Sequence, residues 1–169
     1  LIYVSMGTVI NERPDFYKSC IDAVKDLNAD LIISYGKQMA PSILGELPEN
    51  VKAYPSVNQL EVLAKVSAFI THCGMNSVSE SLFMATPMAL YPQTGEQKAV
   101  ARRVTELGAG IHLESDDAAG IRKALQEILS NDSYAKAARE CHDDFRFRHL
   151  FRKEGYHSLG DPCKRRHNL

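Results

Sequence analysis

The sequence has no excess of charge of either sign and no long apolar run. Lys and Arg together make up 20 of the 169 residues, against 21 for Asp and Glu. This balance gives no indication of a nucleic-acid partner or an anionic membrane surface. Every uncharged apolar run falls far short of the ~20 residues that a membrane-spanning helix requires, so we expect no membrane span. The length fits one domain with a hydrophobic core of its own.

Closely spaced cysteine pairs are also absent. The four cysteines are Cys20, Cys73, Cys141 and Cys163, and no two of them have the spacing of a zinc site. We therefore expect reduced thiols, a cytoplasmic location and no zinc. No signal peptide is visible, but the chain opens directly on an expected strand, so a leader further upstream remains an alternative.

Two common nucleotide-binding motifs are missing, the GxxxxGK[ST] loop and the GxGxxG fingerprint, which argues against a Walker site and a nicotinamide site. The chain instead alternates apolar strands with helical patterns, which predicts an α/β fold with a doubly wound, Rossmann-like parallel sheet. We expect strands at 1–5, 29–35, 51–54, 66–70, 88–91 and 110–113. We expect helices at 14–27, 59–64, from 75 onward, 96–107, 116–129 and 133–150.

The segment after the fourth expected strand carries polar groups at the start of a helix. Residues 72–77 supply a histidine, a glycine, an amide and a hydroxyl. Free N–H groups and the positive end of the helix dipole gather there and favour phosphate binding. Glu80 lies about 5–6 Å further along the helix axis than Asn76, where a carboxylate can accept hydrogen bonds from sugar hydroxyls. A structural alternative is that Asn76 or Ser77 simply caps the helix.

Other polar groups are expected at the same edge of the sheet. Glu96 and Gln97 begin a helix after the fifth strand, and Gly7 and Thr8 follow the first strand. A glycine permits close approach of the backbone, and a threonine hydroxyl can reach a phosphate oxygen. Because ligands of open α/β sheets bind at the carboxyl ends of the strands, this pattern predicts a nucleoside diphosphate site.

The segment from residue 71 to residue 97, THCGMNSVSESLFMATPMALYPQTGEQ, resembles the donor-binding signature of the family 1 UDP-glycosyltransferases. These enzymes share the two-domain GT-B fold, and the bacterial macrolide-glycosyltransferase-like branch is the most similar. Further matching positions are 59–63, Pro87, Pro92, 103–104 and 106–110. The resemblance covers residues 1–150, which we expect to be the donor-binding domain and one half of a GT-B enzyme. Residues 151–169 are expected to be an irregular tail rather than a nucleic-acid patch.

The resemblance implies a role for each matching residue. The diphosphate would be held by Gly7, Thr8, His72, Gly74, Met75, Asn76 and Ser77. The base and ribose would be held by Ser56, Val57, Gln59 and Glu80. Hydroxyls of the transferred sugar would be held by Glu96 and Gln97. Neutral donors and the helix dipole would stabilise the leaving diphosphate, so no metal and no cofactor is expected.

Three positions depart from the family pattern. Ser56 stands where an aromatic residue is common, and Asn58 stands where proline is usual. Stacking of an aromatic ring is worth about 1–3 kcal/mol per base. Its loss at Ser56 would weaken the preference for uridine, so the choice between uracil and thymine is open. Glu96 stands where aspartate is more common, so the identity of the sugar is open as well.

The resemblance also implies what lies outside these residues. Family enzymes deprotonate the acceptor with a histidine and aspartate of an amino-terminal domain, so we expect no catalytic residue in this chain. The expected function is UDP-hexose binding for an inverting, metal-independent transfer to a hydroxyl of a small-molecule or lipid acceptor. The expected partners are the UDP-sugar and a missing amino-terminal acceptor-binding domain, in cis or in trans. Alternatives are a donor-binding subunit of a two-chain N-acetylglucosaminyltransferase, a non-catalytic nucleotide-binding module, and a GT-B epimerase.

Overall fold

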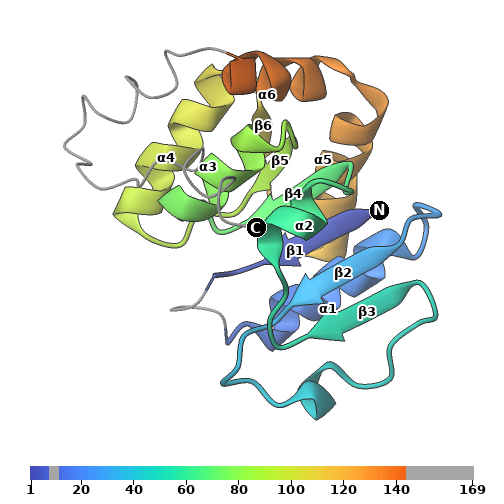
Figure 1. Cartoon of the computed structure of the whole chain (residues 1–169). Helices are drawn as coiled ribbons and strands as arrows, with labels where there is room; N and C mark the ends of the chain where they lie inside the picture. The colour runs from blue at the N-terminus through green and yellow to red at the C-terminus, as the bar shows by residue number, and fades with distance from the viewer. Residues whose placement is uncertain (8–11, 144–169) are drawn as a thin grey trace.

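The computed structural model describes residues 1–7 and 12–143 (Figure 1). The strands in this part of the chain are β1 (Ile2–Ser5), β2 (Leu31–Ser34), β3 (Val51–Tyr54), β4 (Ala68–Thr71), β5 (Met88–Leu90) and β6 (Gly110–His112). The helices are α1 (Pro14–Val24), a 3-10 turn η1 (Pro41–Leu44), α2 (Gln59–Leu63), α3 (Met75–Phe83), α4 (Gly95–Glu106), α5 (Ala118–Ser130) and α6 (Ser133–Asp143).

The strands form one parallel sheet in the order β3-β2-β1-β4-β5-β6. This arrangement confirms the predicted doubly wound parallel sheet. The direction of winding reverses between β1 and β4, which pair from Ile2 opposite Ala68 to Ser5 opposite Thr71. Ligands of such sheets bind where the loops diverge at this reversal point. The loops after β1 and β4 therefore define the place to search for a site.

Two hydrophobic cores cover the two faces of the sheet. Ile2 and Val4 point to the core that contains the apolar faces of α1 and α5. Tyr3, between them in sequence, points to the core that contains residues of α3, α4 and α6. Successive side chains of a strand point to opposite faces, and a sheet buried on both faces is apolar throughout. Figure 1 shows α1 and α5 on one side of the sheet and α2, α3 and α4 on the other.

The observed boundaries differ from the predicted ones by a few residues. The helix predicted to reach Leu27 ends at Val24, because the chain turns there and Asn28 adopts a left-handed conformation (φ 45°). The predicted short turn near Ile43 is the 3-10 turn η1. The predicted continuation of the last helix to residue 150 and the tail 151–169 lie outside the described residues. Within residues 1–7 and 12–143, no helix is long and apolar enough to cross a bilayer.

Candidate functional site

The ring of His72 lies between two glycines at the carboxyl ends of β1 and β4. A Cβ atom added to Gly7 would lie only 2.5 Å from His72 Cε1, and one added to Gly74 would overlap His72 Nε2. Gly7 also has φ +79°, a conformation that other residues rarely adopt. The two glycines therefore allow the imidazole to pack directly against the backbone of both loops. Three residues predicted to contact the diphosphate are brought together here.

Burial controls the charge of His72. It lowers the pKa of the imidazole below the usual 6.5, and the nearby Ser5 carbonyl opposes this shift only in part. Nδ1 is buried and has no hydrogen bond of good geometry within the described residues. A histidine with a lowered pKa is neutral at pH 7. It can therefore donate one hydrogen bond without bringing a full charge to the site.

The turn from β4 into α3 is built on Thr71 and Cys73. Cys73 has φ +66°, which costs a non-glycine residue of the order of 1–3 kcal/mol. Its N–H donates to Thr71 Oγ1 at 3.2 Å, and the thiol donates to the Thr71 carbonyl at 3.5 Å. Burial raises the pKa of Cys73 to about 12, so the thiol stays protonated. Its role is to shape the turn that follows His72.

The amino terminus of α3 has no side-chain cap. Gly74 is the N-cap residue, and no side chain caps the helix. The structural alternative in which Asn76 or Ser77 caps the helix is therefore wrong, because both lie inside the first turn. The left-handed conformation of Cys73 lets the helix start directly after Gly74, before Asn76 and Ser77. No residue pattern in the sequence predicts this turn. The uncapped N–H groups and the helix dipole form a site that suits an anion.

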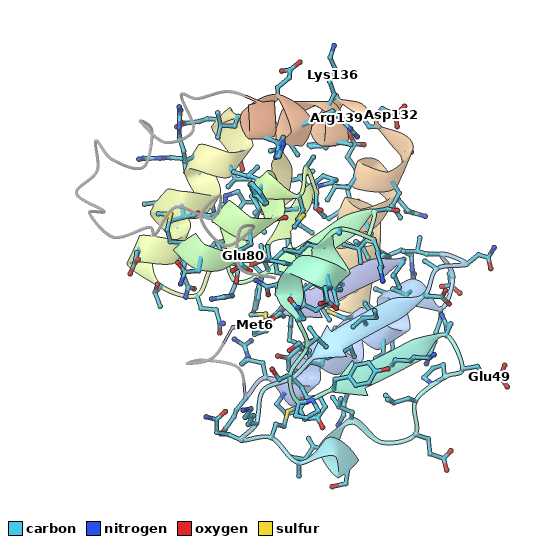
Figure 2. All side chains as sticks on the ribbon, viewed as in Figure 1. Met6, Glu49, Glu80, Asp132, Lys136 and Arg139 are labelled. Atoms are coloured by element: carbon cyan, nitrogen blue, oxygen red, sulfur yellow. The ribbon has the colours of Figure 1, made fainter. Side chains whose placement is uncertain are left out.

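Gln59 joins α2 to α3 at the position predicted for the ribose. Its Nε2 donates to Glu80 Oε2 at 2.8 Å and to Ser77 Oγ at 3.3 Å. Its Oε1 accepts a hydrogen bond from the hydroxyl of Tyr3 at 3.2 Å. Figure 2 labels Glu80 on α3 and Met6 just past the end of β1. The sequence did not point to Tyr3, which reads as an ordinary core residue of an apolar strand, yet it fixes the amide of Gln59.

The loop after β3 places Val57 and Ser56 differently. Val57 is half-buried and packs against the core on the α3 side of the sheet, whereas Ser56 is exposed. Asn58, which stands where proline is usual, is the N-cap residue of α2, and its Nδ2 donates to Glu61 Oε1 at 2.6 Å. The departure from the family pattern is thus accommodated by a local side-chain contact.

Gln97 has a structural role that the sequence analysis missed. Its Oε1 accepts hydrogen bonds from the N–H groups of Gln93 at 2.7 Å and Thr94 at 3.2 Å, and its own N–H donates to Thr94 Oγ1 at 3.3 Å. This is a capping box, and the Thr-x-x-Gln spacing is its signal. Only the Nε2 group of Gln97 remains for a ligand. Glu96, beside it, is exposed.

A second polar cluster surrounds Arg13, immediately before α1. Its guanidinium donates to Gln93 Oε1 at 2.9 Å and to the Tyr91 hydroxyl at 2.8 Å, and lies 3.5 Å from Asp116 Oδ2. The Tyr91 hydroxyl donates to the same carboxylate at 2.7 Å. Partial burial and the Asp116 hydrogen bond raise the pKa of Tyr91, while Arg13 lowers it. The sequence analysis missed this cluster, because its members are up to about a hundred residues apart.

The remaining predicted positions add little to this picture. Thr8 lies outside the described residues. Within residues 1–7 and 12–143, no group of three or more His, Cys, Asp or Glu side chains is arranged to hold a metal ion. Cys20, Cys73 and Cys141 form no disulfide within the part of the chain that the structure describes.

A family model described as "UDP-glucoronosyl and UDP-glucosyl transferase" matches residues 1–144. The chain is 37% identical over 142 residues to an uncharacterized UDP-glucosyltransferase, YojK of Bacillus subtilis strain 168. This match covers 83% of the chain and 35% of YojK. The chain is also 41% identical over 129 residues to the NDP-glycosyltransferase YjiC of Bacillus licheniformis, a match that covers 75% of the chain and 33% of YjiC. The chain thus spans about a third of the length of these relatives.

Solved structures agree with these matches. The glycotransferase of kitacinnamycin superimposes with a TM-score of 0.80 at 30% identity, over 86% of this chain and 38% of that one. A UDP-glucose: anthocyanidin 3-O-glucosyltransferase, solved in complex with UDP, superimposes with a TM-score of 0.72 at 26% identity. That match covers 84% of this chain and 34% of the enzyme.

Proposed function

Because the chain belongs to the UDP-glucosyl and UDP-glucuronosyl transferase family and has the fold of one half of a GT-B enzyme, we propose that it binds the UDP-hexose donor. The whole enzyme transfers the hexose to a hydroxyl of a small-molecule or lipid acceptor. An amino-terminal domain, in the same chain or a second one, supplies the acceptor site. The length of the relatives, about three times the part matched here, supports such a domain.

The observation that carries the proposal is the packing of His72 between Gly7 and Gly74, beside the uncapped start of α3. A neutral imidazole, open backbone N–H groups and a helix dipole together suit a diphosphate. In this proposal Met75, Asn76 and the rest of the first helical turn contact the phosphate oxygens. The relative with UDP bound supports the choice of nucleotide.

The nucleoside lies on the α2 side of the diphosphate. Glu80, oriented by Gln59, accepts hydrogen bonds from the ribose hydroxyls, and the backbone of Val57 pairs with the base. The short contact between Gln59 and Glu80 supports this assignment, because it fixes one carboxylate oxygen and leaves the other for a ligand. Exposed Ser56 provides no aromatic ring for stacking, so we expect weak discrimination between uracil and thymine.

The hexose lies toward the amino terminus of α4. Glu96 accepts hydrogen bonds from its hydroxyls, and Nε2 of Gln97 donates one. The capping box supports the role of Gln97, since Oε1 already accepts two hydrogen bonds and Nε2 can act only as a donor.

The chemistry is an inverting displacement without a metal. The acceptor oxygen attacks the anomeric carbon from the face opposite UDP, and the bond from that carbon to the phosphate oxygen breaks. UDP leaves with the electron pair, and the developing charge is stabilised by His72 and the start of α3. The acceptor proton passes to a base of the amino-terminal domain. The chain alone is therefore expected to bind donor without transferring it.

Calorimetric titration of the 169-residue chain with UDP, TDP, GDP and UDP-glucose, each with and without EDTA, tests the proposal. We expect saturable UDP binding that survives EDTA. His72→Ala and Glu80→Ala should each weaken it by about 1–3 kcal/mol. His142→Ala is a matched control, because His142 contacts the Phe83 carbonyl at the opposite end of α3.

The outcomes separate the candidate functions. Loss of binding on adding EDTA would overturn metal independence. Unchanged affinity in both site variants would favour a non-catalytic module that binds nucleotide elsewhere. Absence of any nucleotide binding by the folded chain would overturn the donor site itself.

A further inference from the structure

We propose that Arg13 is the positioning residue for the donor-sugar contact. It acts through the segment 91–95, which leads from β5 into α4 and presents Glu96 and Gln97. The inference rests on the proposed function, since it concerns how the same site holds the sugar. Arg13 itself touches neither nucleotide nor sugar in this proposal.

The guanidinium joins three separate parts of the carboxyl edge. Arg13 precedes α1, Tyr91 and Gln93 follow β5, and Asp116 lies in the loop between β6 and α5. The two terminal nitrogens of Arg13 are both engaged, one by Gln93 Oε1 and the other by the Tyr91 hydroxyl and Asp116. The planar fork of arginine suits such divergent partners, which a lysine ammonium cannot match.

Aromatic contacts hold this fork in place. The ring of Tyr91 stacks on Phe16 of α1, with centroids 4.3 Å apart and planes 7° from parallel. The Arg13 guanidinium carbon lies 5.5 Å from the centroid of the Tyr91 ring. Asp116 balances the positive charge, so Arg13 is poorly suited to attract a phosphate directly. Its contacts fit a structural element with a fixed geometry.

Two hydrogen bonds, linked through Gln93, connect Arg13 to Gln97, which holds the sugar in the proposed function. Arg13 holds the side chain of Gln93, and the backbone N–H of Gln93 donates to Oε1 of Gln97 at 2.7 Å. The same oxygen is fixed by Thr94. When Oε1 is fixed, the direction of the Nε2 group of Gln97 is fixed as well. A shift of Gln93 therefore moves the one donor that Gln97 offers to a ligand.

A purely structural ion pair would behave differently. The side chains of Arg13 and Asp116 are 36% and 55% exposed, and pairs at such exposure contribute little to stability. Their loss would change unfolding slightly and would not distinguish UDP from UDP-glucose. A positioning role predicts a selective loss of affinity for the ligand that carries the sugar.

The test compares UDP and UDP-glucose binding to the 169-residue chain and to Arg13→Ala, Arg13→Lys and Tyr91→Phe. We expect Arg13→Ala to weaken UDP-glucose about five- to tenfold, the effect of one misplaced hydrogen bond, and to change UDP less than twofold. Arg13→Lys should behave like the alanine variant. Ethylguanidinium added to Arg13→Ala should restore part of the UDP-glucose affinity.

Two further measurements secure the result. Tyr91→Phe removes only the hydroxyl and should produce a smaller loss in the same direction, which covers the case in which Arg13→Ala does not fold. Hydrogen exchange should be faster at the amides of residues 93–94 in Arg13→Ala. Arg122→Ala is the matched control, because that arginine also pairs with a carboxylate, Asp26 at 2.9 Å, but anchors the far end of α1.

Several outcomes would overturn the positioning role while leaving the donor site intact. One is an equal loss for UDP and UDP-glucose in Arg13→Ala, and another is no loss for either. A third is an Arg13→Lys variant that binds UDP-glucose as tightly as the unaltered chain, which would mean that only the positive charge matters. If the unaltered chain binds no UDP, the proposed function fails, and the role of Arg13 fails with it.

Discussion

His72 connects burial and protonation in a single side chain, the one to which we assign the diphosphate contact. Its pKa in the folded chain lies below 6.5 because burial penalises the imidazolium. In an unfolded chain the imidazole is solvated and takes up a proton near pH 6.5. Folding is therefore coupled to the loss of a proton from this ring in mildly acidic solution.

We predict that His72 makes the fold acid-sensitive. Its contribution to stability is present above pH 6.5 and is lost as the pH falls from there through the lowered pKa of the folded state, because only the unfolded chain is then protonated. Thermal unfolding at pH 7.5 and pH 5 measures this loss. The drop in melting temperature should be smaller in His72→Gln, and an equal drop in both proteins would contradict the prediction.

Gly74 tests the close packing against the same ring. We predict that Gly74→Ala destabilises the fold by about 1–3 kcal/mol and weakens UDP binding, because the new Cβ must displace the imidazole. Chemical denaturation and UDP titration measure the two effects. Gly95→Ala is the matched control for stability, since a Cβ there meets no heavy atom within 4 Å. Similar unfolding free energies in the two variants would show that the ring has room to move.

At the scale of elements, the first turn of α4 contains a residue to which we assign two roles. Gln97 closes the capping box through Oε1 and has its Nε2 left for a ligand. The two purposes use different atoms of one amide, so a substitution can separate them. Glutamate is the other residue that capping boxes commonly use at this position.

We predict that Gln97→Glu keeps the helix start and loses the sugar contact. A carboxylate still accepts the hydrogen bonds from Gln93 and Thr94 and is favoured by the helix dipole, so the melting temperature should not fall. UDP-glucose affinity should decrease about threefold to tenfold while UDP affinity is kept. Gln97→Ala, by contrast, should lower both the melting temperature and the UDP-glucose affinity. Unchanged UDP-glucose binding in Gln97→Glu would exclude Nε2 as a ligand donor.

The helices and strands were largely predictable from the sequence. The local turns and the long-range side-chain hydrogen bonds between them were not. Alternating apolar runs and helical spacing placed every strand within a few residues, because both faces of a parallel sheet must be apolar. Gly74 was predictable from the signature, and Gly7 from the turn after the first strand. The N-cap at Gly74 was not, since it depends on the left-handed turn at Cys73. The partners of Arg13 were not predictable either, because they meet only after β5 and β6 have been placed in the sheet.

At the scale of the whole molecule, our proposal assigns the donor site to this chain and the base for the acceptor to an amino-terminal domain. We predict that the 169-residue chain binds UDP-glucose but transfers no glucose to a phenolic acceptor. Chromatographic detection of the glucoside and of released UDP measures this. The UDP-glucose: anthocyanidin 3-O-glucosyltransferase, assayed with an anthocyanidin as the acceptor, is the positive control. Transfer by the chain alone, abolished by His72→Ala, would place a complete active site within it.

The position of β1 in the sheet has a consequence for synthesis on the ribosome. β1 can pair with β2 soon after both have left the ribosome. The backbone hydrogen-bonding groups on its other edge pair only with β4, which begins at Ala68. Until then an apolar strand has an open edge, and open edges promote pairing with other chains. The strand that closes this edge, β4, leads directly into His72 and α3. Nascent chains stalled before β4 should therefore depend on chaperones, and this dependence should end once α3 has emerged.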